Sequence, residues 1–311
     1  MILAGKELSL EIQKDLKNQA AKLGTDKYVA IIFLGDDYSS ATYVNHKQKY
    51  WEAIWIPVAI FGQYKKTDLP SNQEDKFNDI SIYIKQNYDS IFKIMELISF
   101  LNYDKDCLWI IVQLPLPEKF KEYQSQILSA ISPTKDIDGL GWVLTWLTEI
   151  GRIDFTPATP KAVFTLLKHY KLDNLKGKTV AILGQSNIVG KPLAVELINQ
   201  WATVYTCNAD TPQAQIKTIT KMADYIISCT WKVYLIDESY IRDDKSQILI
   251  DVGYGHIDGK PVWDINIPSI ENKVSSYTPV PGGIGPLTVA CLFDNVFVLQ
   301  KNKEILKQYK L

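Results

Sequence analysis

Residues 179–192 (TVAILGQSNIVGKP) decide the fold predicted for this chain. The run TVAIL is typical of a buried strand, Gly184 and Gly190 bracket the turn that follows, and residues 193–199 predict a helix. Glycines in a turn between a strand and a helix let the backbone approach a pyrophosphate group. The spacing is GxSxxxG rather than GxGxxG, so the pattern alone supports an ordinary tight turn of an α/β domain equally well.

Strands and helices alternate on both sides of this stretch. The predicted strands are residues 28–34, 58–61, 108–112, 203–206, 225–228 and 248–252, and the first predicted helices are residues 8–23 and 39–53. Such alternation predicts parallel sheets. We therefore expect an α/β protein with two α/β domains, the second a Rossmann-type doubly wound parallel sheet. Segments rich in Pro and Gly at residues 131–160 and 278–286 are predicted to connect the halves.

Composition narrows the function classes. The chain has 311 residues, 46% hydrophobic and 22% charged, which suits two domains with a core each. Its 34 Lys and Arg against 35 Asp and Glu give no basic excess for nucleic acid or an anionic membrane. Residues 91–101 form the most apolar stretch, but Lys93 and Glu96 interrupt it, so no membrane span is predicted. The N-terminal residues do not form a signal peptide pattern.

The positions of the cysteines argue against a disulfide-bonded or zinc-binding protein. Cys107, Cys207, Cys229 and Cys291 are far apart and include no CxxC pair, so neither a disulfide framework nor a zinc site is indicated. We expect a cytoplasmic protein with a small-molecule partner.

Three polar side chains are candidates for a site in the first half. Tyr43 and Lys47 are four residues apart and share one face of a predicted helix. A solvated lysine is the commoner case, and a lysine becomes a general base only where burial or another cation lowers its pKa. Gln113 follows a strand at its carboxyl end, where α/β ligands bind, although an ordinary strand exit explains it as well.

Two further segments have both a functional and a plain interpretation. Asp136 and Asp138 place two carboxylates on a loop, where they are able to bind a metal or the amidine-like edge of a heterocycle, or to form a simple Asx turn. Residues 281–286 (PGGIGP) suit a backbone close to a ligand or a rigid turn. His46, His169 and His256 show no metal spacing, so no metal is expected.

Taken together, these segments resemble the bifunctional methylenetetrahydrofolate dehydrogenase/methenyltetrahydrofolate cyclohydrolase family. The resemblance is carried in order by LGDD (34–37), YVNHK (43–47), VQLPLP (112–117), KDIDG (135–139), TPATPKA (156–162), GKTVAILGQSNIVGKP (177–192), LIDVG (249–253) and TPVPGGIGPLTVA (278–290). It spans nearly the whole chain. The resemblance implies a one-carbon enzyme acting on tetrahydrofolate derivatives, with an active-site cleft between the two domains and a homodimer as the assembly.

The resemblance also assigns roles. Lys47 matches the catalytic lysine, Gln113 the glutamine that holds its amine, Tyr43 the tyrosine that packs beside the folate, and Asp138 the aspartate that binds the pterin ring. The resemblance implies that the substrate is also bound by Pro281, Gly282 and Gly283. The cofactor-binding residues that it implies are Gly184, Gln185, Ser186, Gly190, Ala209, Trp231 and Tyr254. The implied domains are residues 1–145 with 286–311, which bind folate, and 146–285, which bind NAD or NADP.

The chain departs from the family pattern on the cofactor side. Gln185 stands where an arginine commonly pairs with the 2′-phosphate of NADP, and Ala209 and Asp210 replace a serine and an arginine. An anion at Asp210 would repel a 2′-phosphate and accept a hydrogen bond from a ribose hydroxyl, so NAD is favoured over NADP.

Bulky residues are the second departure. Trp231 and Val233 stand in place of a glycine and a proline, Tyr254 in place of a smaller aliphatic residue, and Ala158 in place of a common cysteine. Either the Trp231 indole fills the dinucleotide groove, or neighbouring loops have moved to accommodate it. Three hypotheses follow: the bifunctional enzyme, a cyclohydrolase with a degenerate dinucleotide site, and a non-catalytic folate-binding homologue.

Overall fold

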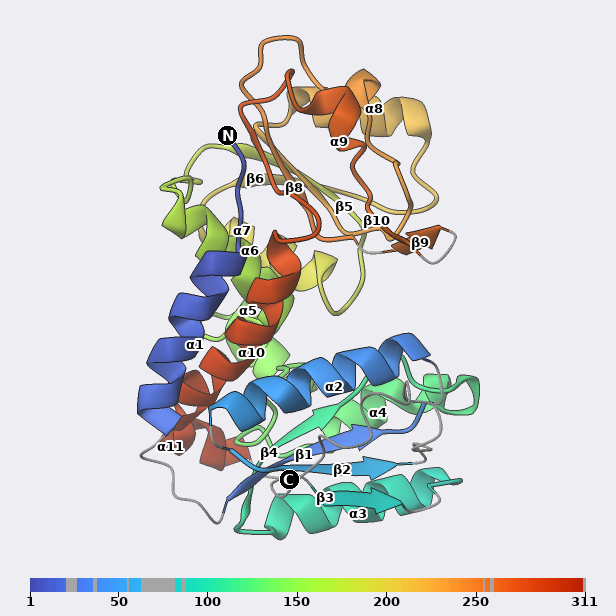
Figure 1. Ribbon diagram of the computed structural model, residues 1–311, viewed down its shortest axis with the longest axis vertical. Coiled ribbons are helices and arrows are strands. Elements are labelled where there is room, and N and C mark those ends of the chain that lie inside the picture. The colour runs from blue at the N-terminus through green and yellow to red at the C-terminus, as the bar shows by residue number, and fades with distance from the viewer. Residues whose placement is uncertain are drawn as a thin grey trace. The chain divides into compact units, whose positions relative to one another are not determined.

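The computed structural model describes residues 1–20, 27–35, 38–54, 56–62, 82–85, 88–253, 255–257 and 260–309 (Figure 1). Positions 38–43, 46, 82–85, 255–257 and 260–262 are described by their backbone alone. The chain forms two compact units. Unit 1 comprises Met1–Ile12 and Thr156–Leu292, and unit 2 comprises Gln13–Phe155 and Phe293–Leu311. Helices α1 (Lys6–Ala20) and α10 (Ile284–Lys301) each begin in unit 1 and end in unit 2.

Unit 1 contains a five-stranded parallel sheet in the order β11-β8-β7-β5-β6. Its strands are β5 (Thr179–Leu183), β6 (Thr203–Cys207), β7 (Tyr225–Ser228), β8 (Ile248–Asp251) and β11 (Ser276–Tyr277). Strand β5 pairs with β6 on one side and with β7 on the other, so the chain reverses its direction of travel across the sheet at β5. Ligands of open α/β sheets bind at the carboxyl ends of the strands around such a reversal.

Both faces of this sheet are covered by helices. Helices α6 (Ala158–His169) and α7 (Gly190–Asn199) pack on the face that presents Val180 and Ile182. Helix α8 (Gln213–Met222) packs on the face that presents Ala181 and Leu183, with η4 (Glu238–Tyr240) and α9 (Ile267–Ile270). A strand covered on both faces reads as a continuous apolar run, which is why TVAIL shows no alternation.

Two smaller features complete unit 1. The N-terminal residues lie beside the last strand, because Ile2 bridges Tyr277 in parallel and the Leu3 N–H donates to the Tyr277 carbonyl at 2.8 Å. Strands β9 (Gly255–Ile257) and β10 (Lys260–Val262) form an antiparallel pair.

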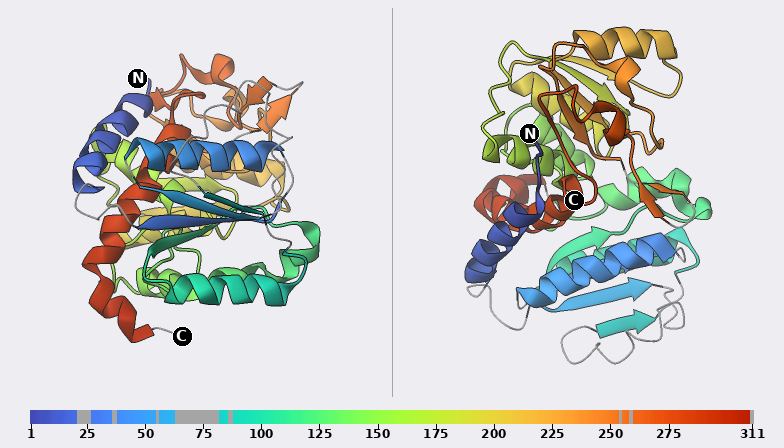
Figure 2. Two further views of the ribbon diagram at one scale, coloured as in Figure 1. Left: turned by 60° about the horizontal axis from the view of Figure 1, so that its bottom comes forward. Right: turned by 45° about the horizontal axis from the view of Figure 1, so that its top comes forward.

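Unit 2 contains a four-stranded parallel sheet in the order β3-β2-β1-β4. Its strands are β1 (Tyr28–Phe33), β2 (Val58–Gly62), β3 (Ile82–Lys85) and β4 (Cys107–Val112), and its other elements are α2 (Tyr38–Ala53), α3 (Ile91–Tyr103), η3 (Glu118–Tyr123), α4 (Gln124–Ser129), α5 (Trp142–Glu149), α11 (Lys303–Leu306) and η5 (Lys307–Tyr309). Helices α2 and α3 lie on opposite faces of the sheet (Figure 2, left). The core between α3, α4 and the sheet is built from aliphatic residues of β1 and β4.

The two-domain α/β prediction with parallel sheets is confirmed, and most predicted strands agree with the structure to within one residue. One expectation was wrong: the stretch between the predicted strands 58–61 and 108–112, interpreted as a long helical region, contains strand β3 as well as helix α3. The predicted connection at 131–160 contains helix α5 and also the point at which the two units divide. The predicted domain limit at residue 145 falls inside α5, whereas the two units divide between Phe155 and Thr156. In the part of the chain that the structure describes, no helix has the length and apolarity needed to cross a bilayer.

Candidate functional site

Lys47 and Gln113 meet in unit 2, as the resemblance implies. The Lys47 Nζ donates a hydrogen bond of 3.1 Å to the Gln113 Oε1. Gln113 is 7% exposed and follows β4 directly, where its backbone N–H donates to the Ile32 carbonyl of β1 at 2.9 Å. Its side-chain Nε2 donates to the Leu114 carbonyl at 2.6 Å, so the amide oxygen is turned toward the lysine. The pair therefore consists of a half-buried amine directed by a buried amide.

Trp51 fixes the helix that carries Lys47. Lys47 is one turn before Trp51 on α2, so the two side chains share a face. Trp51 is 0% exposed, and its ring centroid lies 5.8 Å from that of Trp109 on β4 and 3.9 Å from that of Phe293 on α10. Truncating a buried tryptophan costs roughly 3–5 kcal/mol. The strand that ends at Gln113 is thus packed against the helix that carries Lys47.

The turn after Asp136 brings in the third candidate, Asp138. Asp136 bridges Ile110 of β4, and its carboxylate accepts the N–H groups of Gly139 at 2.9 Å and Gly141 at 2.8 Å. Asp136 is therefore the Asx-type turn former. Burial and, less strongly, the charge of Asp138 raise the pKa of Asp136 to about 7, although the two N–H donors oppose this shift.

Asp138 lies within electrostatic reach of Lys47. Burial raises the pKa of the Asp138 carboxyl, and the Lys47 charge opposes that rise. Among the described residues no hydrogen-bond donor to the Asp138 carboxylate is recorded, so this carboxylate is available to a ligand. Tyr43 belongs to α2, and its side chain lies outside the described part of the chain.

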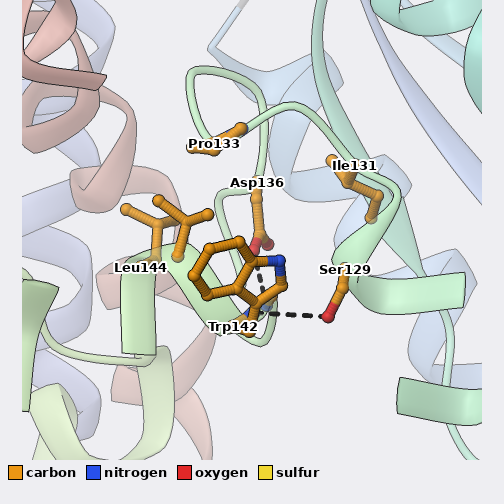
Figure 3. Close-up of a pocket in the computed structure, with 8 residues that line it drawn as sticks. Ser129, Ile131, Pro133, Asp136, Trp142 and Leu144 are labelled. Carbon is orange, nitrogen blue, oxygen red and sulfur yellow. Dashed lines mark hydrogen bonds between the residues drawn. The ribbon is translucent and has the colours of Figure 1, made fainter. Parts of the chain in front are cut away.

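A shallow hollow beside this turn is not a substrate pocket. It is lined by Ser129, Ile131, Pro133, Asp136, Gly141, Trp142, Val143 and Leu144 (Figure 3). It has no enclosed space for a water molecule, and the backbone N–H of Trp142 donates across it to the Ser129 Oγ at 3.3 Å.

The glycine turn in unit 1 has the backbone geometry that its sequence predicts. Gly184 follows β5 directly and has a φ of +113°, which residues other than glycine rarely adopt. A Cβ atom on Gly190 would lie 2.0 Å from the Gly184 carbonyl oxygen, so the start of α7 approaches the end of β5 too closely for any side chain. The Ser186 Oγ accepts the N–H groups of Val189 at 3.1 Å and Gly190 at 3.5 Å.

Gln185 is held by neutral partners. Its Nε2 donates to the Thr206 Oγ1 at 2.8 Å, and its Oε1 accepts from the Asn208 Nδ2 at 3.2 Å. The Asp210 N–H donates to the Asn208 Oδ1 at 3.0 Å, while the Asp210 side chain and Ala209 are exposed. Thr206 and Asn208 are not predictable from the sequence as partners of Gln185, because only the pairing of β5 with β6 brings them to it.

Trp231 is turned toward solvent. It is 64% exposed, and its φ of +61° is one that glycine adopts readily and tryptophan does not. The hypothesis that the indole fills the groove is not supported, because a side chain that filled it would be buried against the turn. Ala158 begins α6 and is 9% exposed, Val233 is half-buried, and Tyr254 lies outside the described residues.

Residues 281–283 are engaged by the N-terminal segment. The Gly282 carbonyl accepts the N–H groups of Gly5 at 2.7 Å and Lys6 at 3.2 Å, and a Cβ on Gly283 would lie 2.6 Å from the Pro279 carbonyl oxygen. Pro281 is exposed. The structure thus supports the interpretation as a turn, and a role in substrate binding stays a prediction. Within the described ranges no three His, Cys, Asp or Glu side chains are grouped so that they could hold a metal ion.

A Rossmann-type unit with a glycine turn, together with a second α/β unit that carries an amide-held lysine, defines the class of α/β enzymes that use dinucleotides. Comparison with models of known families identifies one family within this class. Residues 3–138 match the tetrahydrofolate dehydrogenase/cyclohydrolase catalytic domain, and residues 157–304 match the NAD(P)-binding domain of the same family. The chain therefore belongs to the tetrahydrofolate dehydrogenase/cyclohydrolase family.

Individual relatives agree with this assignment over nearly their full length. The bifunctional protein FolD of Campylobacter jejuni is 36% identical over 307 residues, covering 97% of this chain and 99% of the relative. A crystal structure of the Campylobacter jejuni enzyme has a TM-score of 0.82 at 33% identity, covering 97% of this chain and 99% of that one. The Trypanosoma brucei enzyme, solved with NADP and an inhibitor, has a TM-score of 0.82 at 27% identity and covers 98% of both chains.

Proposed function

We propose that this protein interconverts methylene-, methenyl- and formyl-tetrahydrofolate, with Lys47 as the general base of the hydrolytic step. The observation that carries the proposal is the 3.1 Å hydrogen bond between the Lys47 Nζ and the Gln113 Oε1, beside the Asp138 carboxylate. An amine held by an amide acceptor has a fixed direction, which is what a proton transfer at one carbon requires.

In the cyclohydrolase step, water adds to the cationic methenyl carbon. The water oxygen forms the new bond to carbon, the electron pair of the C=N bond returns to nitrogen, and a water proton passes to the Lys47 amine, which acts as the general base. The bond from this carbon to one ring nitrogen then breaks, Lys47 returns its proton to that nitrogen, and the remaining hydroxyl loses its proton to solvent as the formyl group forms. Gln113 keeps the amine in place. The Asp138 carboxylate accepts hydrogen bonds from the amidine-like edge of the pterin ring.

In the dehydrogenase step, unit 1 supplies the dinucleotide site. The residues fit such a ligand, since Gly184 and Gly190 allow the backbone after β5 and the start of α7 to pack more closely than any side chain permits, which is the turn geometry that brings backbone N–H groups to a pyrophosphate. When bound, the nicotinamide accepts the hydride of the methylene group. The backbone from Gly184 to Gly190 would hold the pyrophosphate, and Gln185 and Asn208 would face the adenosine ribose.

We infer that NAD is preferred over NADP. Gln185 is engaged by neutral Thr206 and Asn208, and the exposed Asp210 carboxylate follows Asn208 closely. A 2′-phosphate would meet an anion there, whereas a 2′-hydroxyl is able to donate to it.

We further propose a cytoplasmic homodimer that pairs through unit 1. Strand β6 is the edge of the sheet, and Ile198, Trp201 and Tyr205 around it are 59%, 76% and 36% exposed. The four cysteines are buried, and none forms a disulfide bond within the described residues, which suits a reducing compartment. Light scattering on the purified protein tests the assembly, and a monomer at micromolar concentration would contradict it.

The central experiment replaces Lys47 with methionine. We expect methenyl-tetrahydrofolate hydrolysis to fall by at least about 10²-fold, the usual scale of general-base catalysis, with little change in melting temperature because the amine is half-buried. Lys49→Met, on the same helix but exposed, is the control and should hydrolyse normally.

The outcomes separate the three hypotheses. Unchanged hydrolysis in Lys47→Met would favour a non-catalytic folate-binding homologue, and a large loss of melting temperature would assign the lysine a structural role. Parallel assays of methylene-tetrahydrofolate oxidation with NAD and NADP decide whether the dehydrogenase half is active, because a monofunctional cyclohydrolase would reduce neither. Faster turnover with NADP would overturn the cofactor preference.

A further inference from the structure

A buried carboxylate that the proposed reaction does not use, Asp264, organises the segment after β7. Asp264 is 1% exposed, and its Oδ2 accepts four hydrogen bonds. The donors are the Ser228 Oγ at 2.8 Å, the Thr230 N–H at 2.7 Å, the Thr230 Oγ1 at 2.9 Å and the Trp231 N–H at 3.3 Å. One carboxylate oxygen thus fixes both ends of residues 228–231.

This segment lies directly against the glycine turn. The Cys229 N–H donates to the Leu183 carbonyl at 2.8 Å, and its Sγ donates to the same oxygen at 3.1 Å. A Cβ on Gly184 would lie 2.5 Å from the Cys229 carbonyl oxygen. Any displacement of residues 228–231 is therefore transmitted to Gly184, where the glycine turn begins.

The position of Asp264 is itself tightly fixed. A Cβ on Gly253 would lie 2.1 Å from the Asp264 carboxylate, so the loop after β8 closes over it. The Asp251 carboxylate accepts the N–H groups of Ile265 at 2.8 Å and Gly253 at 2.9 Å, which holds the backbone next to Asp264. Burial, and less strongly the charge of Asp264, raise the pKa of Asp251 to about 7, while the N–H donors oppose this rise.

We propose that Asp264 is a positioning residue for the dinucleotide: it holds residues 228–231 against Gly184 and thereby sets the affinity of unit 1 for NAD without touching it. The inference rests on the proposed dehydrogenase function. Ser228 is fully buried and Thr230 half-buried, so removing the carboxylate leaves their donors without an acceptor and the segment rearranges to recover partners.

The test measures NAD affinity by calorimetry and the dinucleotide KM in Asp264→Ala, Asp264→Asn and Thr230→Val, with methenyl-tetrahydrofolate hydrolysis measured in parallel. We expect Asp264→Ala to weaken NAD binding at least tenfold while hydrolysis changes less than twofold. Asp264→Asn should recover most of the affinity, because its amide oxygen accepts the same donors. Thr230→Val, which at nearly constant volume removes one donor to Asp264 and the acceptor of the exposed Lys232 N–H, should weaken NAD binding about threefold.

Asp237→Ala is the matched control. Asp237 also accepts a backbone N–H, from Ser239 at 2.8 Å, but it caps η4, and its loss should leave NAD affinity unchanged. Unchanged NAD affinity in folded Asp264→Ala, or an equal loss of both activities, overturns the inference. If Asp264→Ala does not fold, Thr230→Val decides, and an unchanged affinity there overturns it. If the parent protein binds neither NAD nor NADP, the dehydrogenase half of the proposed function fails and this inference with it.

Discussion

The lysine site of unit 2 and the glycine turn of unit 1 are each held by a buried aspartate, but the side chains around them differ in their exposure to solvent. In each, a buried aspartate holds a turn by accepting backbone N–H groups: Asp136 in unit 2 and Asp264 in unit 1. The residue types expected from the resemblance are all present around Lys47, whereas Gln185 and Trp231 differ from them in unit 1.

The solvent exposure of the side chains explains why the expected residue types are present around Lys47 but not around the glycine turn. Gln113 is 7% exposed and shares its amide with two partners, so a change there disturbs the packing and the lysine together. Trp231 is 64% exposed, and the Asp210 side chain reaches solvent. Side chains at the rim of the glycine turn are therefore replaceable without loss of the backbone that they border, and we propose that cofactor preference is set there.

The largest effect should come from Gln113→Leu, which keeps the volume but removes the acceptor for Lys47. We expect methenyl-tetrahydrofolate hydrolysis to fall about 100-fold, since the amine loses its direction, while NAD affinity stays the same. Gln126→Leu, on the exposed side of α4, is the control. A parallel loss of NAD affinity would break the comparison, because it would show that the two sites do not act separately.

The next effect is a change of cofactor. Gln185→Arg combined with Asp210→Ser should raise kcat/KM for NADP roughly 30-fold relative to NAD, the equivalent of about 2 kcal/mol from a charge-assisted hydrogen bond to the 2′-phosphate. Gln215→Arg adds the same charge on the exposed face of α8 and should leave the ratio unchanged. An unaltered ratio in the double variant would show that cofactor preference is set elsewhere.

A smaller effect should appear in the pH dependence of stability. The pKa of Asp136 is raised from 3.8 to about 7, so the folded state holds the proton more tightly, and the contribution of this carboxyl to stability declines as the pH rises from about 4 to about 7. Asparagine does not titrate. Between pH 5 and pH 8 the free energy of unfolding of Asp136→Asn should therefore gain roughly 2–3 kcal/mol relative to the parent.

Asp251 provides the corresponding experiment in unit 1, because its pKa is also raised to about 7. Asp251→Asn should show the same slope, and Asp243→Asn, at an exposed position, should follow the parent. Denaturant titrations at several pH values measure the slope. Parallel profiles for Asp136→Asn and the parent would refute the assignment of the raised pKa.

The smallest effect is expected for Trp231→Gly. The φ of +61° costs a tryptophan about 1 kcal/mol, and the entropy that glycine loses on folding offsets most of the relief, so stability should change by less than about 0.5 kcal/mol. NAD affinity should change less than threefold. Lys171→Gly, with a φ of +58° away from the dinucleotide turn, calibrates the backbone contribution. A gain in affinity above tenfold would restore the blocked-groove hypothesis.

The sequence analysis found most strands because buried parallel strands are continuous apolar runs, as in TVAIL. It did not find β3, a strand of four residues between polar segments, nor helix α5. The contact between Lys47 and Gln113 spans 66 residues, so no local spacing reveals it. Only the resemblance suggested it, and the packing of Trp51 on Trp109 explains it. The network around Asp264 was invisible for the same reason, because its donors are 33–36 residues away.

The path of the chain through the two units has a consequence for how the molecule is made. Unit 1 requires Met1–Ile12 as well as residues up to Leu292, and unit 2 requires Phe293, whose ring packs on Trp51. During synthesis on a ribosome, neither core is complete until the final helices emerge, so the two cores are finished late and almost together rather than in the N-to-C order of separately folding domains.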